Sequence, residues 1–405
     1  MIRVHKIRLY PNDRQATLLI KSCGVARFAY NWALAEWKRQ YEAGEKPKEA
    51  KLRKQLNAMK REQFPWMSEV SKNAPQQAIK NLGTAFNNAF SRLKRGEKPG
   101  FPRFKRKGIR DGFRADNGPS QAAPNAVKVD GQRIQLAVIG WVRMAEPVRF
   151  DGAIRSATVS KEADQWQVAL AIETAEVLQP GTVQSVVGVD LGIKALATLS
   201  NGEVHEGPKA HRQLLRRIQQ QSRSLSRKQK GSVNRAKAKT KLARLHLRVA
   251  HLRKDALHKL TTRLATGFSV IGIEDLNVKG MVKNRCLARS VSDAGFFEFR
   301  RQLGYKAAMT GAKVILADRW FPSSKTCSQC GAIHDMPLSK RMFSCECGNK
   351  MDRDLNAAIN LRNYAVSSTV SACGEEGSGL GRTLKTKPAS AKQESSAKPG
   401  MSRFG

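Results

Sequence analysis

Three carboxylates occupy positions at which metal-dependent chemistry is possible. Asp190 closes one apolar run, Glu274 closes a second, and Asp354 opens a helical pattern that follows a third. A carboxylate at the end of an apolar strand lies at the rim of a sheet, where loss of solvent raises its pKa unless a cation is bound. Two such strands and a helix supply the acids that two-metal phosphoryl chemistry requires. We therefore predict that these three residues are catalytic and hold two Mg²⁺ ions, for which Mn²⁺ is a substitute; the alternative is a chance set of rim acids.

Four of the seven cysteines lie close together and are spaced as metal ligands. Cys327 and Cys330 form a C-x-x-C pair followed by glycine, and Cys345 and Cys347 form a C-x-C pair. A disulfide framework would spread its cysteines along the chain, and a cytosolic compartment would keep them reduced. Four thiolates close a tetrahedral site with no open position, so we predict one structural Zn²⁺ ion. His334, in the loop between the pairs, is an alternative ligand.

The charge balance indicates a polyanionic partner. The chain of 405 residues carries 73 Lys and Arg against 33 Asp and Glu, which gives a formal net charge of +40. Nucleic acids are the abundant polyanions that such a protein meets. No apolar run reaches the roughly 18 residues of a membrane span, and the first residues lack the apolar core of a signal peptide, so membrane and secreted proteins are excluded. The alternative is a ribosomal-type binder that performs no chemistry, which composition alone does not exclude.

Positive charge is concentrated in two segments. Residues 209–254 contain 16 Lys and Arg and no acid, and their apolar residues keep helical spacing, which predicts one or two long basic helices. Like charges at this density repel one another unless a polyanion is bound. The loop at 94–107 is the second basic segment. Candidate contacts to nucleic acid in these segments are Arg103, Lys105, Arg106, Arg216, Arg217, Arg227, Lys228, Lys237 and Lys241.

The hydrophobic pattern changes along the chain and predicts the elements that position these residues. The first half combines a strand at 4–10, helices from Asn12 to Trp37 and from Pro75 to Leu93, and a region of period two at 127–174. That region contains short runs at 127–129, 133–136, 148–150 and 167–170, and predicts a small barrel or sandwich.

The second half alternates apolar strands with helices. Strands are expected at 186–191, 195–199, 268–274 and 313–317, and helices at 296–309 and 354–364. This order fits an RNase H-like α/β layout. Residues 366–405 are rich in Ser, Gly, Lys and Pro, and we predict a disordered tail.

Several motifs give the chain a resemblance to a known family. The segments at 188–194 (GVDLGIK), 273–276 (IEDL) and 352–360 (DRDLNAAIN), together with the cysteine pairs, resemble the RuvC motifs and zinc ribbon of the OrfB/TnpB transposon-associated family. The motifs occur in the family's order, and the resemblance covers roughly residues 1–364. The C-x-C pair departs from the commoner C-x-x-C.

The resemblance implies a multidomain α/β plus β-barrel fold. It implies a wedge-like β-barrel at 1–10 and 101–180 with a helical recognition insertion at 11–100. A RuvC-like nuclease domain at 183–320 and 351–365 would then enclose a zinc ribbon at 321–350 that binds the target nucleic acid. Carried over by motif, the catalytic residues are Asp190, Glu274 and Asp354; Asp352 competes for the third place, but D-x-N-A-A matches from Asp354.

The resemblance also implies an RNA-guided DNA endonuclease related to type V CRISPR effectors. Such a protein pairs a guide RNA from the transposon end with double-stranded target DNA beside a transposon-adjacent motif, in the prokaryotic cytoplasm and on the nucleoid. The helical part would recognise this motif. Lys72 and Gln76 are candidates, because Gln pairs with adenine and Lys reaches guanine in the major groove; the alternative is that both only decorate a helix surface.

Two other functions remain open. A transposase that cuts and joins DNA uses a similar acidic triad, so the triad does not separate the two activities. A nucleic-acid-binding regulator would keep the fold and lose the chemistry, but all three acids are present.

Overall fold

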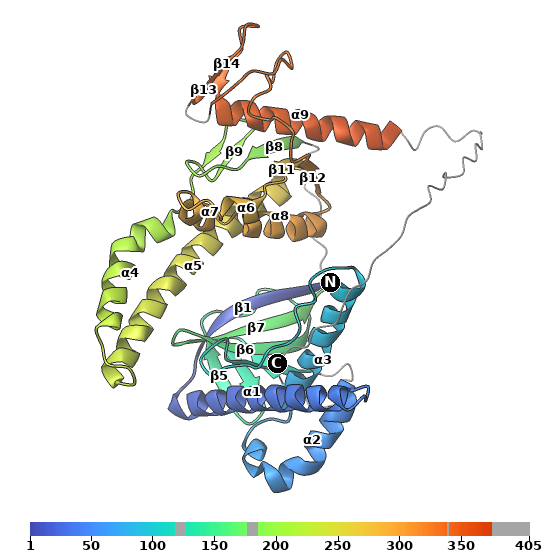
Figure 1. The fold of residues 1–405 in the computed structure, drawn as a ribbon, viewed down its shortest axis with the longest axis vertical. Coiled ribbons are helices and arrows are strands. Elements are labelled where there is room, and N and C mark those ends of the chain that lie inside the picture. The colour runs from blue at the N-terminus through green and yellow to red at the C-terminus, as the bar shows by residue number, and fades with distance from the viewer. Residues whose placement is uncertain (118–126, 176–184, 338–339, 375–405) are drawn as a thin grey trace, which may run out of the picture.

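The computed structural model describes residues 1–117, 127–175, 185–337 and 340–374. These residues form a seven-stranded sheet, a five-stranded sheet and a two-stranded ribbon, with helices packed around them (Figure 1). The expected mixture of α/β and β structure in several parts is therefore confirmed. No helix in these ranges is both long and apolar enough to cross a membrane.

The first sheet is antiparallel and takes its central strand from the N-terminus. β1 pairs with β7 and with β5, so the first residues of the chain complete a sheet whose other strands lie after residue 111. The order is β2-β6-β7-β1-β5-β4-β3. The strands are β1 (Ile2–Tyr10), β2 (Gly112–Asp116), β3 (Val127–Asp130), β4 (Arg133–Leu136), β5 (Gly140–Met144), β6 (Ala153–Glu162) and β7 (Gln165–Glu173).

The predicted β-barrel is not found in the described residues. β2 and β3 remain the two ends of the sheet, and no strand ladder joins them there. The ends approach each other through one side chain: the Asn117 amide donates to the carbonyls of Val127 (2.9 Å) and Ile154 (3.0 Å) and accepts from the Val127 N–H (2.9 Å). The period-two pattern predicts strands but does not decide whether the end strands pair. The run at 148–150 is irregular, and a strand begins only at Ala153.

The helices between β1 and β2 pack on this sheet. Asn12 caps α1 as predicted: its side chain accepts from the Gln15 N–H (2.8 Å), and the Gln15 side chain accepts from the Asn12 N–H (3.1 Å). α2 was not expected. The helices are α1 (Asp13–Glu42), α2 (Glu49–Gln63), the 3₁₀ helix η1 (Pro65–Glu69) and α3 (Asn73–Lys94).

The second sheet is mixed and has the order β10-β9-β8-β11-β12. β8, β11 and β12 are parallel, and β9 and β10 are antiparallel to their neighbours. The strands are β8 (Val186–Asp190), β9 (Ala197–Leu199), β10 (Val204–His205), β11 (Val270–Glu274) and β12 (Lys313–Ala317). The connecting helices are α4 (Ala210–Ser226), α5 (Val233–Gly267), α6 (Val278–Met281), α7 (Ala288–Ala294) and α8 (Phe296–Thr310).

α9 (Arg353–Gly374) covers one face of this sheet, and α5 and α8 pack against the other (Figure 1). Val187, Val189, Ile271 and Ile273 share a buried core with leucines of α5 and α8. Side chains alternate along a strand, so the intervening glycines face α9. A Cβ on Gly188 would overlap the Ala358 carbonyl oxygen, and one on Gly272 would overlap that of Leu361. Glycine at both positions therefore brings the α9 backbone directly onto the sheet.

The C-terminal helix is longer than expected. α9 continues past Val366 to Gly374, so the start of the predicted disordered tail is helical. The remainder of that tail, from residue 375, lies outside the described residues. The two-stranded ribbon of β13 (Met342–Ser344) and β14 (Lys350–Asp352) immediately precedes α9.

Candidate active site and metal centre

The alternation that places two glycines under α9 also directs two acids toward it. Asp190 lies two residues after Gly188, and Glu274 lies two residues after Gly272, so each acid shares the glycine's face of the sheet. Parallel β8 and β11 end at the same edge. Asp354 belongs to the first turn of α9. Two strand ends and one helix start therefore bring the three predicted acids to one corner of the sheet.

The electrostatics of Asp190 reflect this arrangement. Desolvation, followed by the negative charges of Glu274 and Asp354, raises the pKa of Asp190 well above its usual range, and Arg353 only partly opposes this. Carboxylate oxygens that repel one another are the donor set that Mg²⁺ and Mn²⁺ prefer, and a bound cation would relieve the repulsion. In the described part of the chain the cysteines, whose ligand atoms lie within 4.8 Å of one another, are the only group of three or more side chains found close enough to hold one ion, so the three acids do not form such a group. Two-metal sites divide their carboxylates between two ions.

Glu274 and its neighbour Asp275 differ in their hydrogen-bond and ion-pair partners. Asp275 forms ion pairs with Arg300 and Arg319, and the hydrogen bonds from these arginines lower its pKa. Glu274 accepts a hydrogen bond from the Ser323 hydroxyl and has no ion pair within the described residues. Asp275 is neutralised by the protein itself, which leaves Glu274 as the acid available to a cation.

Asp352 and Asp354 also differ in their partners, but in another way. One oxygen of Asp352 accepts from the N–H groups of Asp354 (2.9 Å) and Leu355 (3.3 Å), so this side chain caps the N-terminus of α9. The Asp354 carboxylate lies 3.4 Å from the Arg353 guanidinium and 3.9 Å from that of Arg341. Asp352 is occupied as a helix cap, and the assignment of Asp354 as the third acid of the centre stays a prediction.

Two buried asparagines connect α9 to the segment before the cysteines. The Asn360 amide donates to the carbonyls of Ser323 and Thr326, both at 2.7 Å. The Asn356 amide donates to the Thr326 carbonyl at 2.7 Å and accepts from the Ser328 N–H at 3.0 Å. Sequence reasoning missed Ser323 and both asparagines. The available signal was their spacing of four residues, which puts the asparagines on one face of a helix.

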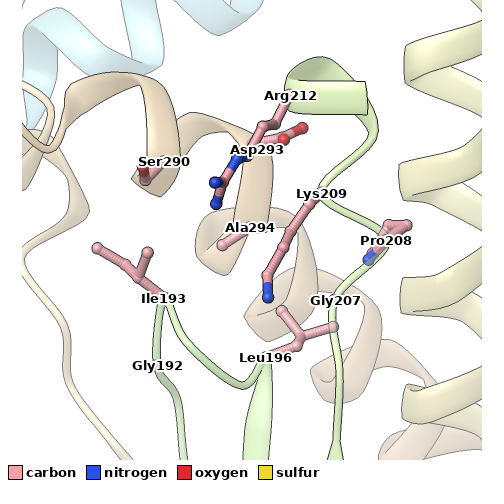
Figure 2. Close-up of a pocket in the computed structure, with 10 residues that line it drawn as sticks. All are labelled: Gly192, Ile193, Leu196, Gly207, Pro208, Lys209, Arg212, Ser290, Asp293 and Ala294. Atoms are coloured by element: carbon pink, nitrogen blue, oxygen red, sulfur yellow. The ribbon is translucent and has the colours of Figure 1, made fainter. Parts of the chain in front are cut away.

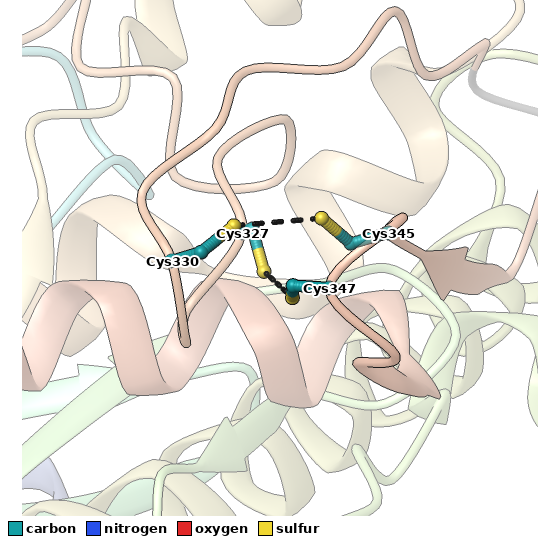
Figure 3. A group of neighbouring side chains, drawn as sticks. All are labelled: Cys327, Cys330, Cys345 and Cys347. Carbon is teal, nitrogen blue, oxygen red and sulfur yellow. Dashed lines mark hydrogen bonds between the residues drawn. The ribbon is translucent and has the colours of Figure 1, made fainter.

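The four cysteines converge as predicted (Figure 3). The Sγ atoms of Cys327 and Cys347 are 3.6 Å apart, and those of Cys330 and Cys345 are 3.5 Å apart. Bonds of about 2.3 Å to a tetrahedral zinc require sulfurs about 3.8 Å apart, so the cluster fits structural zinc. The Nε2 atom of His334 lies 3.1 Å from the Cys345 sulfur. The four cysteines already provide the four ligands of a tetrahedral zinc site, so His334 is not needed as a ligand.

Comparison with known proteins decides the family. A proposed RNA-guided DNA endonuclease of Streptomyces pristinaespiralis is 37% identical, over 97% of this chain and 96% of the relative. InsQ of Escherichia coli K12, described in the same way, is 32% identical, over 96% of this chain and 97% of its own. This chain belongs to the TnpB/OrfB family.

Three family models match separate segments of this TnpB-family chain, and one solved structure matches most of it. The OrfB_IS605 model, described as "Probable transposase", matches residues 159–285, and the Cas12f1-like TNB domain matches residues 296–361. A model described as a helix-turn-helix domain matches residues 1–46, where the structure has β1 followed by the single helix α1. A Cas12f1 chain solved with a single guide RNA and target DNA shares the fold, with a TM-score of 0.55, 14% identity and coverage of 90% of this chain and 99% of that one.

The structure separates the predicted nucleic-acid contacts in the N-terminal part. Lys72 is exposed at the start of α3, and Gln76, one turn later, is half-buried. Arg103 and Arg106 are exposed in the loop before β2. Lys105 has partners within the protein: Asn31 bonds both its N–H (2.8 Å) and its carbonyl (2.9 Å), and its ammonium lies 4.2 Å from the centre of the Tyr30 ring.

The predicted basic helices are α4 and α5, which form a hairpin. Arg216, Arg227 and Lys228 line a hollow of about 630 Å³ on α4, and the exposed Arg217 lies outside its lining. Lys237 and Lys241 are exposed one turn apart on α5. Within 209–254, all of which the structure describes, acidic partners are recorded only for Arg244 and Arg253. Most of this positive charge is therefore uncompensated.

A smaller pocket of about 90 Å³ lies beside the segment that follows Asp190 (Figure 2). Lys209 and Arg212 extend into it from the start of α4, toward Ile193 in the loop after β8. Asp293 of α7 connects the start of α4 to α5 beside this pocket. Its oxygens accept from the His211 N–H (3.1 Å) and from Arg253 of α5 (3.0 Å). The pocket adds two positive charges near the acidic corner.

Proposed function

We propose that this protein is an RNA-guided, metal-dependent DNA endonuclease that cleaves target DNA beside a transposon-adjacent motif. The observation that carries the proposal is the convergence of Asp190, Glu274 and Asp354 from β8, β11 and α9, with the mutual repulsion that raises the pKa of Asp190. The assigned roles of the relatives as RNA-guided DNA endonucleases support the same activity.

In this proposal each acid holds metal and the remaining residues maintain the geometry. Asp190, Glu274 and Asp354 would hold two Mg²⁺ ions, which supply an activated water and stabilise the leaving oxygen of a phosphodiester. The Ser323 hydroxyl orients Glu274. Asp352 fixes the first turn of α9 and with it the position of Asp354.

The cysteine cluster would act on the site indirectly. Zinc would fix the loop that contains Cys327, and Asn356 and Asn360 bond the adjoining segment to α9. Ser323 extends the same connection to Glu274. Loss of zinc is therefore expected to disturb two of the three acids.

Guide RNA and target DNA would bind along the uncompensated basic surfaces. A nucleic-acid duplex is held through many phosphates, and the α4–α5 hairpin supplies many cations, of which only Arg244 and Arg253 within 209–254 have acidic partners. Lys209 and Arg212 would contact phosphates near the acidic corner. Lys72 and Gln76 are proposed to recognise the adjacent DNA motif, because both lie at the start of α3.

The test is cleavage by the purified protein with its own RNA. The RNA that copurifies is sequenced, and plasmids that carry the matching target followed by randomised bases are incubated with Mg²⁺. Cleavage that depends on the match and on a particular adjacent motif supports the proposal. Joined rather than free DNA ends would indicate a strand-transfer transposase, and binding without any cut product would indicate a regulator.

A further inference from the structure

Trp320 is the most exposed large apolar side chain in the part of the chain that the structure describes, with 85% of its surface accessible. It follows β12, which runs parallel to β11 and ends at the same edge of the sheet as Glu274. The indole is therefore presented to solvent beside the acidic corner and has no role in the core.

The backbone around Trp320 is held on both sides. The Trp320 N–H donates to Asp318 (2.8 Å), and Arg319 pairs with Asp275 (2.5 Å), the residue after Glu274. On the other side, Ser323 donates to Glu274, and the Phe321 ring packs 5.0 Å from that of Tyr364 on α9. An aromatic side chain that projects from a fixed backbone is already ordered for binding, so little conformational entropy is lost when a ligand covers it.

The surroundings of Trp320 have the chemistry of a single-strand binding site. Arg300 of α8 shares Asp275 with Arg319, and Phe297, one helical turn before Arg300, is 69% exposed. Aromatic faces together with arginines bind unpaired bases with little regard to sequence, because every base has a π-face. A protein partner would require a contiguous surface of about 800 Å², whereas these aromatics are interrupted by charged side chains.

We propose that Trp320 stacks on an unpaired base of the DNA strand that is presented to Asp190, Glu274 and Asp354. The inference rests on the proposed nuclease function and adds to it a residue that positions the DNA strand beside the acids. Bases in a duplex are already stacked and cannot cover the indole. Stacking on Trp320 therefore requires a base that is not paired in a duplex.

The first experiment measures stacking without cleavage. The full-length Asp190→Ala protein is titrated into oligodeoxythymidine that carries one 2-aminopurine, whose fluorescence falls when it stacks. We expect quenching, and we expect Trp320→Ala to remove it and to weaken binding by about 5- to 150-fold. Trp320→Tyr keeps an aromatic face and should retain most of the quenching. Ile333→Ala is the control, because Ile333 is also 69% exposed but offers no ring.

The second experiment separates this inference from the proposed function. In an otherwise wild-type protein, Trp320→Ala should raise KM for single-stranded DNA while kcat and the unfolding temperature change little. Unchanged quenching and KM would overturn the stacking inference while cleavage by the wild-type protein still supports the nuclease. If the wild-type protein cleaves no DNA, the proposed function fails, and the quenching assay still decides whether Trp320 stacks. A change of oligomeric state in Trp320→Ala with unchanged quenching would assign the indole to a second copy of the chain and overturn the inference.

Discussion

Asp190 differs from most acids of this basic chain because its charged neighbours are mainly other acids. Asp275 meets two arginines and Asp164 meets Arg244, whereas Asp190 meets Glu274 and Asp354. A desolvated acid among acids destabilises the folded state whenever it is ionised. Stability is therefore sacrificed at one residue for the ability to bind a cation.

Asp190→Asn tests whether the ionised carboxylate lowers the stability of the folded protein and is required for metal-dependent cleavage. We expect loss of Mg²⁺-dependent cleavage together with a higher unfolding temperature in buffer without Mg²⁺, because the amide keeps the shape and removes the repulsion. The pKa of Asp190 lies above the ordinary 3.8 in the folded state, so the wild-type protein should lose stability relative to the variant as pH rises above 3.8 and match it below. Thermal unfolding across pH measures the difference. Identical unfolding temperatures of the two proteins at all pH values would show that the ionised Asp190 side chain does not destabilise the folded protein.

The two aspartates at the start of α9 provide a matched pair. Asp352→Asn should retain cleavage to within a few-fold, because Asn caps a helix about as well as Asp. Asp354→Asn should abolish cleavage, because an amide is a poor replacement for a metal-binding carboxylate. Initial cleavage rates of the two variants, at equal zinc content, make the comparison. The reverse ranking would move the third acid to Asp352.

At the level of elements, the contact between α9 and the mixed sheet sets the position of the acids. Gly272 lies under the Leu361 carbonyl, so Gly272→Ala should destabilise the protein by about 1–3 kcal/mol and reduce cleavage by displacing Asp354 from Glu274. Gly304→Ala, in α8, is the control, because a Cβ there meets nothing within 4 Å and should be neutral or stabilising by up to about 1 kcal/mol. Chemical denaturation and cleavage rates test both. Equal stability of the two variants would contradict the packing argument.

The sequence predicted elements well where burial is strongly periodic. The strand at 313–317 and the helices beginning after Asn12 and at Phe296 appear with nearly the expected bounds. α2 was missed because only Leu52 and Leu56 of its residues are buried, which leaves little pattern to detect. The strand β6 was missed because polar residues alternate irregularly with its few buried ones.

The candidate site could be predicted only in part for a similar reason. An acid at the end of an apolar run can be recognised from the sequence alone, and so can a closely spaced pair of cysteines. Ser323 and Asn360 act through contacts with residues 49 and 37 positions away, and no local pattern encodes such contacts. The period-two pattern left a barrel or a sandwich open and the resemblance implied the barrel, but the ladder that would close it is absent from the described strands.

Zinc should stabilise the active corner through the same contacts. Cys330→Ser is expected to release zinc and to reduce cleavage strongly, because the segment bonded to Glu274 and α9 loses its fixed end. Cys286→Ser is the control, because Cys286 is exposed and lies outside the cluster. Metal analysis and cleavage rates are measured on the same preparations. A wild-type protein without zinc, or full activity in Cys330→Ser, would break the proposed link.

Over the whole molecule, positive charge is distributed unevenly. Several arginines in and beside the antiparallel sheet are paired locally, such as Arg133 of β4 with Asp130 and Arg149, between β5 and β6, with Glu146. The α4–α5 hairpin instead presents a run of cations, and Arg244 donates a hydrogen bond to Asp164 in the turn between β6 and β7 (3.0 Å). The hairpin is therefore expected to supply a disproportionate share of the contacts to phosphate.

Salt dependence distinguishes charge that contacts phosphate from charge that is already neutralised. Each phosphate contact contributes about 0.9 to the slope of log K against log salt on duplex DNA. Arg216→Gln combined with Arg223→Gln, both lining the hollow on α4, should weaken binding to every duplex sequence and reduce the slope by about two. Arg133→Gln combined with Arg149→Gln makes the same change in net charge on arginines that have acidic partners, and should leave the slope nearly unchanged. Equal slopes for the two double variants would show that net charge, rather than the hairpin, governs binding.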